Sequence, residues 1–244
     1  MADKNEQPLM YHLIELRRRL IFCVIAIALG AGIAFGLHKI IISAMLGPAS
    51  GFSDIAQGKP IFTELTEFIG ITMKISILGG LVIALPVIIY HGIMFVNPGI
   101  TRKERIYIFA GLPVSVGAFL LGVTFGYFVL LPPAINFLLT FGSDVATPLI
   151  RIGNYISLTI TLLFWIGISF ETPIIMFLLA KIGVVKPKTF AKQRRFAIVG
   201  AFILAAIITP TFDPINQTIV AIPIIILYEI GIWLSKLARR EKTK

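Results

Sequence analysis

Long apolar stretches, separated by short segments rich in charges and prolines, are the feature that most constrains how this chain can fold. The longer stretches exceed the ~17 residues that a helix needs to cross the hydrocarbon core of a bilayer. Apolar runs predict helices at about 20–46, 68–95, 106–131, 155–180, 196–210 and 217–233. Only 14% of the residues are charged, against roughly 25% in soluble domains. We therefore predict an all-α, polytopic membrane protein whose residues 1–244 form one integral membrane domain.

The last two predicted helices are short. At 1.5 Å per residue the fifth helix, 196–210, spans ~22 Å, whereas the hydrocarbon core is ~30 Å thick. We expect the bilayer to thin around these two helices, or their polar ends to be shielded. The third helix is expected to stop at Pro132 and Pro133, and two longer loops, 47–67 and 132–154, are expected to cover the far end of the bundle.

The distribution of Lys and Arg predicts the orientation in the membrane. With six crossings both termini lie on the same side, and that side carries 18 of the 22 Lys and Arg residues. The other four are Lys39, Lys59, Lys74 and Arg151. Basic loops are typically cytoplasmic, so we predict cytoplasmic N- and C-termini. The formal charge of +10 then reflects topology and does not indicate a nucleic-acid partner.

Several function classes lack their sequence signatures. One cysteine and three histidines provide neither a disulfide framework nor a zinc-ligand spacing. No phosphate-binding GxxxxGK[ST] run, HExxH motif or nucleophile elbow occurs, so we expect no metal, no cofactor and no catalytic residues. The first apolar stretch is longer than that of a signal peptide and is predicted to remain as an anchor.

Two other classes of membrane protein fit the sequence less well than a transport scaffold. A small-solute secondary transporter predicts repeated halves and several polar groups near the midplane, whereas this sequence shows no repeat and one clear midplane acid. An intramembrane enzyme would need a nucleophile and base, and no such pair is evident. The GxxxG spacings Gly32 to Gly36 and Gly122 to Gly126 favour close helix packing, within the chain or between copies of it.

Two acids stand out among the basic residues predicted to be cytoplasmic. Glu15 lies four residues before Arg19, a spacing that allows a solvated ion pair on one helix. Glu104 follows Thr101 at the spacing of a capping box, so it could cap the third helix. A carboxylate has two oxygens and can combine such a role with ligand binding. Two such acids could receive guanidinium groups, because bidentate bonding favours Arg over Lys.

A third acid, Glu171, falls near the middle of the fourth predicted helix. An ionisable side chain at that depth is costly and is by default a functional candidate. The alternative is a carboxyl group that bonds locally, because Pro173 frees the carbonyl of Ser169. The polar segment 209–217 is open to two interpretations: it could be a plain turn, or Gln217 at the membrane edge could bond a partner helix.

A series of ordered motifs supports a family resemblance. They are His12-Leu13-Ile14-Glu15-Leu16-Arg17, Phe95-Val96-Asn97-Pro98-Gly99, Glu104-Arg105, Phe125-Gly126-Tyr127-Phe128 with Pro132, Ser169-Phe170-Glu171-Thr172-Pro173, Thr209-Pro210, Gln217-Thr218, Ala221-Ile222-Pro223 and Leu227-Tyr228-Glu229. Together they resemble TatC, the multi-spanning component of the twin-arginine protein translocase, along essentially the whole chain.

The resemblance implies a receptor for twin-arginine signal peptides that passes folded proteins across a prokaryotic inner membrane and uses the proton motive force. It places signal-peptide binding at Glu15 and Glu104, with Arg17 and Phe95 nearby, and a functional intramembrane acid at Glu171. It implies as partners the single-span proteins TatA and TatB, docking near Thr209 and Gln217, together with further copies of the chain and the lipid bilayer. The segment between Pro210 and Gln217 is one residue longer than the usual pattern, which leaves the alignment of Asp213 open.

Overall fold

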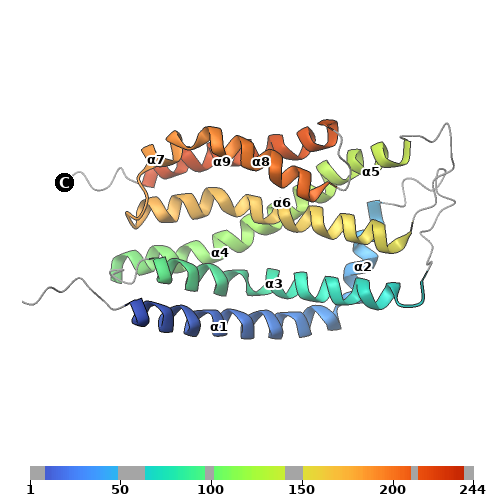
Figure 1. The fold of residues 1–244 in the computed structure, drawn as a ribbon, viewed down its shortest axis with the longest axis horizontal. Helices are drawn as coiled ribbons and strands as arrows, with labels where there is room; N and C mark the ends of the chain where they lie inside the picture. Colours follow the sequence, from blue (N-terminus) through green and yellow to red (C-terminus); the bar gives the residue numbers. More distant parts are fainter. Residues whose placement is uncertain (1–8, 49–63, 97–101, 141–150, 210–213, 239–244) are drawn as a thin grey trace, which may run out of the picture.

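The computed structural model is almost entirely helical over the residues that it describes, which are 9–48, 64–96, 102–140, 151–209 and 214–238, without the side chains of 9–12, 96, 102–105 and 216. The elements are α1 (Leu9–Gly36), α2 (His38–Leu46), α3 (Glu67–Val96), α4 (Arg102–Phe125), the π-helical segment η2 (Gly126–Leu130), α5 (Leu131–Thr140), α6 (Ile152–Lys181), α7 (Pro187–Lys192), α8 (Arg194–Ile208) and α9 (Pro214–Ala238). The long helices run between the same two ends of the molecule (Figure 1).

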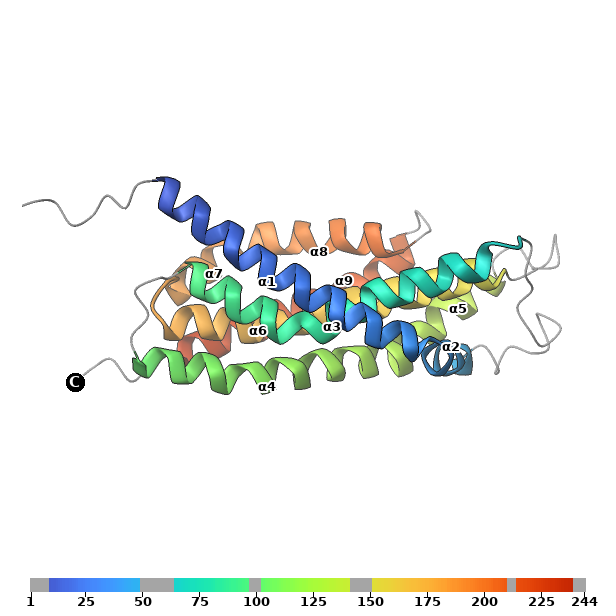
Figure 2. The same cartoon turned by 90° about the horizontal axis from the view of Figure 1, so that it is seen from below.

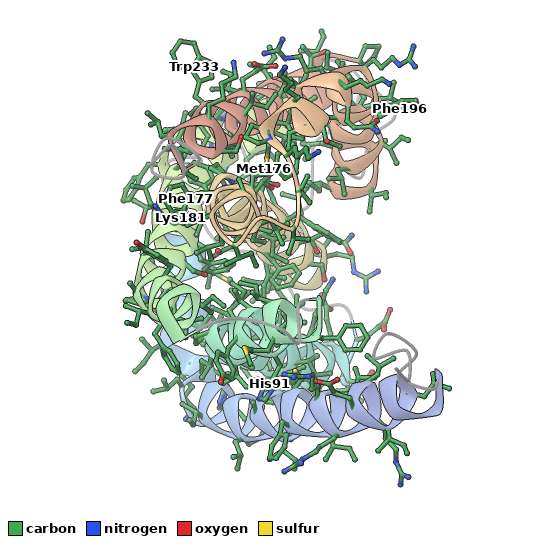
Figure 3. All side chains as sticks on the ribbon, turned by 90° about the vertical axis from the view of Figure 1, so that its left-hand side faces the viewer. His91, Met176, Phe177, Lys181, Phe196 and Trp233 are labelled. Carbon is green, nitrogen blue, oxygen red and sulfur yellow. The ribbon has the colours of Figure 1, made fainter. Side chains whose placement is uncertain are left out.

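One end of the bundle gathers the beginning of α1, the end of α3, the start of α4, α7 and the end of α9 (Figure 1). We call it the terminal end. The helices form a curved arrangement in which α1 packs along α3, α6 packs against both α4 and α9, and α8 packs on α9 (Figure 3). Among the candidate membrane spans α6 is the most buried and α1 the least. The curved bundle therefore has α6 at its centre and α1 at one edge.

The prediction of an all-α, multi-span membrane protein is confirmed. Within the described residues, five helical stretches are long and apolar enough to cross a membrane. The helix α8 has 15 residues and reaches about 22 Å, as short as predicted. The helix α9 is longer than the predicted 217–233 and has 25 residues. The prediction that the last two helices are both short is therefore wrong for α9, whose last turn contains Lys236, where a cation interacts favourably with the helix dipole.

The predicted first helix, 20–46, is in fact two helices. The helix α1 ends at Gly36, Leu37 leaves helical geometry with φ −96° and ψ 3°, and α2 then turns aside (Figure 1). His38 Nδ1 lies 2.6 Å from the Phe35 carbonyl oxygen, near the end of α1. The Tyr155 hydroxyl donates to the Met45 carbonyl oxygen at 2.9 Å and anchors the last turn of α2 to α6.

The predicted end of the third helix at Pro132 and Pro133 is wrong. The helical stretch continues to Thr140, so part of the predicted loop 132–154 belongs to α5. Proline lacks the N–H that would bond to the carbonyl four residues before it. The wider π-helical turn Gly126–Leu130 ends two residues before Pro132, and such a turn relaxes the backbone bonding pattern.

The two GxxxG segments behave differently. A Cβ on Gly122 would lie 3.0 Å from Gly167 Cα, and one on Gly126 would lie 3.0 Å from Leu163 Cδ2, so this pair packs tightly against α6. At Gly32 and Gly36 a Cβ would meet no described atom within 4 Å. Internal packing is thus confirmed for the segment in α4 and η2, but not for the segment in α1.

Candidate functional site

A groove of about 400 Å³ lies between α1 and α3 in their halves near the terminal end. Five of its lining residues come from α1 and three from α3: Ile14, Glu15, Arg18, Arg19, Phe22, Tyr90, His91 and Met94. On each helix they are spaced by one, three or four residues, which places them on one face. The groove therefore combines one acid, two arginines and an aromatic group of side chains.

The groove exists because α1 and α3 touch at one place and diverge from it. At the contact, a Cβ on Gly80 would lie 2.5 Å from Ala31 N, and a Cβ on Gly30 would lie 2.7 Å from the Gly80 carbonyl oxygen. Only glycine allows two backbones to approach so closely. Figure 2 shows α1 inclined across α3, with its N-terminal end on the side of α8 and away from α4.

Aromatic side chains fill the inner part of the groove. The rings of Phe22 and His91 stack with centroids 5.5 Å apart and an interplanar angle of 2°. The Tyr90 ring meets the His91 ring edge-on at 5.2 Å. His91 lies between the two helices (Figure 3), and its Nδ1 is buried without a hydrogen-bond partner among the described groups. The groove therefore offers apolar ring faces next to charged groups.

The predicted pair of Glu15 and Arg19 is present. Arg19 Nε donates a hydrogen bond to Glu15 Oε1 at 3.0 Å, and Arg19 Nη2 contacts the same oxygen. The Glu15 side chain is only 19% exposed and that of Arg19 18% exposed, so the pair is more shielded than the solvated pair that spacing alone suggested. Shielding from water strengthens such an interaction.

Two of the other predicted signal-binding residues, Arg17 and Phe95, lie on the helices that form this groove. Arg17 is exposed and lies along the apolar face of α1 formed by Leu13, Leu16 and Leu20, and it does not line the groove. Phe95 is half-buried and follows the lining residue Met94. Glu104 is part of the first turn of α4, but its side chain lies outside the described residues, as does its proposed capping partner Thr101.

The intramembrane acid Glu171 is buried and 1% exposed. The Ser115 hydroxyl on α4 donates to Glu171 Oε2 at 2.6 Å, while Glu171 Oε1 has no hydrogen-bond partner among the described groups. The local bond to a freed carbonyl, one of the two alternatives from the sequence, is not the contact that forms. Instead the carboxyl group joins α6 to α4, and a half-satisfied buried carboxyl group is costly.

The two candidate docking residues lie near the α8–α9 junction. Thr209 follows α8 and is buried, and its hydroxyl donates to the Ala205 carbonyl oxygen at 2.8 Å. Gln217 lies in the first turn of α9 and is half-buried. Asp213 lies outside the described residues. The outward face of α8 is apolar, since Phe196, Val199 and Ile203 are exposed.

Two parts of the site escaped the sequence analysis. Tyr90, His91 and Met94 line the groove, but they belong to an apolar helix whose sequence does not indicate that this face packs beside α1. Ser115 is a single serine in a span otherwise read for its hydropathy, and it contacts a residue 56 positions away. Within the described ranges no three His, Cys, Asp or Glu side chains come close enough together to hold a metal ion.

The comparisons with known proteins agree with one another. The family model of the Sec-independent protein translocase protein TatC matches residues 11–223. The chain is 40% identical over 237 residues to that protein from Aquifex aeolicus, covering 96% of this chain and 97% of the relative. It is 36% identical over 236 residues to the protein from Carboxydothermus hydrogenoformans, covering 97% of this chain and 95% of the relative.

A solved structure agrees as well. A crystal structure of the twin arginine translocase receptor TatC superimposes with a TM-score of 0.81 at 40% identity, covering 94% of this chain and 100% of the other. The family match thus covers most of the sequence, and the solved structure shares the fold of the helical bundle. The chain belongs to the TatC family, the multi-span membrane components of the Sec-independent protein translocase.

Proposed function

We propose that this protein is the receptor subunit that recognises paired arginines in signal peptides of folded cargo. One observation carries the proposal: a largely buried carboxylate, Glu15, lies in a 400 Å³ groove with aromatic walls at the terminal end of the bundle. A guanidinium group forms charge-assisted, planar bonds with such a carboxylate and stacks on aromatic rings. The groove therefore suits arginine better than lysine.

A second acid completes the proposed site. Glu104 lies in the first turn of α4, which starts at the same end of the bundle as α1 (Figure 1). Two arginines in a row need two carboxylates, and Glu104 is the proposed second one. Phe95 and Arg17 flank the site, and apolar residues that follow the arginines would lie along the exposed apolar face of α1.

The proposed partners are single-span proteins of the TatA and TatB type and further copies of this chain. Docking near Thr209 and Gln217 is supported by the short, outwardly apolar α8 at the edge of the bundle. Cargo movement would use the proton motive force, with Glu171 as the functional intramembrane acid. We place the terminal end in the cytoplasm of a prokaryotic cell, since most of the Lys and Arg residues lie on that side.

The proposal is tested by photo-crosslinking a twin-arginine signal peptide to the full-length protein in membranes. Charge reversal by Glu15→Lys or Glu104→Lys should abolish the crosslink while the protein still inserts. The matched control is Glu229→Lys, because Glu229 pairs with Arg194 on α8 at 2.7 Å, away from the groove. Undiminished crosslinking in both Glu15→Lys and Glu104→Lys would sink the assignment.

A further inference from the structure

The carboxylate proposed to bind a ligand's guanidinium group already holds one from its own helix. Arg19 places both Nε and Nη2 on Glu15 Oε1, with the Nε contact at 3.0 Å. Less than one-fifth of the surface of either side chain is exposed. This pair is therefore better protected from water and salt than an exposed pair on a helix surface.

The fold keeps Arg19 close to Glu15. A Glu four residues before a basic residue is the favoured orientation of such a pair on a helix. Both side chains line the groove beside Phe22 and His91, whose rings stack on each other. Because Arg19 is attached to the same helix, its effective concentration at Glu15 does not depend on any ligand in solution.

We propose that Arg19 is an internal competitor that regulates the twin-arginine site by occupying Glu15 until a ligand displaces it. The inference rests on the proposed function. A ligand guanidinium engages Glu15 fully only in molecules whose Arg19 has moved away. The apparent affinity for the ligand is therefore proportional to the fraction of molecules in that state.

The exchange has a consequence for release. It replaces one guanidinium–carboxylate pair with another, so Glu15 contributes less net affinity than it would without Arg19. The bound peptide then depends on the remaining contacts of the groove, and the returning Arg19 side chain favours its dissociation. A receptor that must hand its cargo onward benefits from a ligand that is held weakly.

The test measures the Kd of a labelled synthetic twin-arginine peptide for the full-length protein in nanodiscs. Arg19→Gln should lower the Kd about two- to fivefold, the factor expected for loss of a partly shielded ion pair. Arg19→Lys should give an intermediate Kd, because the ammonium group keeps the charge but lacks the planar fork. The matched control is Arg194→Gln, which removes the same charge from an exposed pair at the terminal end and should leave the Kd unchanged.

Further variants separate the competitor from the site itself. In a Glu15→Gln background, Arg19→Gln should bring no gain, since the contested carboxylate is gone. An unchanged or higher Kd for Arg19→Gln, an equal gain from Arg194→Gln, or a gain that persists without Glu15 would each overturn the inference. If the wild type binds equally well a peptide with both arginines replaced by glutamine, the proposed function fails and the competitor falls with it.

Discussion

The close approach of α1 and α3 makes Gly80→Ala the most informative single change. A Cβ at this position would lie 2.5 Å from Ala31 N and 2.7 Å from both Ala31 Cα and the Ile27 carbonyl oxygen. All three atoms belong to the backbone of α1, so no side chain can rotate away. The added methyl group must therefore push the two helices apart.

The cost follows from that geometry. Restoring an ordinary contact needs a separation of about 1 Å, which forfeits up to roughly half of the dispersion attraction of each affected atom pair. Overpacking of this kind costs about 1–3 kcal/mol, and replacing glycine by alanine in a helix returns up to about 1 kcal/mol. Because α1 packs chiefly on α3, no other contact compensates. We expect a net loss of about 1–2 kcal/mol.

The assay is reversible unfolding in mixed micelles of detergent and dodecyl sulfate, followed by far-ultraviolet circular dichroism. Gly70→Ala is the control, because Gly70 lies on the same helix and a Cβ there would meet no described atom within 4 Å. It should be neutral or gain up to about 1 kcal/mol. Equal stabilities of the Gly80→Ala and Gly70→Ala variants would refute the inferred crossing, and with it the origin of the groove.

Two further predictions concern buried polar contacts. Ser115→Ala should destabilise the protein by about 1–3 kcal/mol, because it removes the bond to Glu171 and leaves that carboxyl group unsatisfied. The control is Thr124→Ala, which removes an exposed hydroxyl and should lower the stability by under about 0.5 kcal/mol. In a transport assay Glu171→Ala should be inactive, whereas Glu171→Gln should keep some activity because it retains a hydrogen bond. Normal transport by both variants would show that the residue is purely structural. Tyr155→Phe should cost about 1 kcal/mol by the same unfolding assay, since it frees the Met45 carbonyl oxygen from α6; an unchanged stability would show that this anchor of α2 is dispensable.

Hydropathy located most of the long helices because the bilayer sets the length of an apolar run. The stretches 68–95 and 155–180 match Glu67–Val96 and Ile152–Lys181 within three residues at each end. The predicted helix ends are wrong where the backbone breaks inside an apolar run or continues past residues that usually end a helix. The break at Leu37 is stabilised by His38 and by contacts of α2 with other segments, and the stretch around Pro132 continues after a π-helical turn. Neither effect changes local hydropathy.

Half of the candidate site was predictable from local spacing. Glu15 and Arg19 are four residues apart on one helix, so their contact needs no knowledge of the tertiary structure. The opposing wall with Tyr90 and His91 is different, because its register depends on where Gly80 meets α1. In an apolar sequence, small residues indicate where helices that are distant in the chain pack together. The periodicity of hydropathy indicates this less well.

Two of the candidate acids, Glu15 and Glu171, differ in how a ligand can reach them. Glu15 belongs to the least buried span and lines a groove, so its partner Arg19 can exchange while the other helices stay in place. Glu171 belongs to the most buried span, and the close approach of Gly122 to Gly167 closes the seam between α4 and α6 near it. A ligand can therefore meet Glu15 in the resting protein, whereas Glu171 becomes accessible only when α4 and α6 separate. We therefore expect any role of Glu171 in transport to follow a rearrangement of the bundle, and the proposed recognition at Glu15 to precede it.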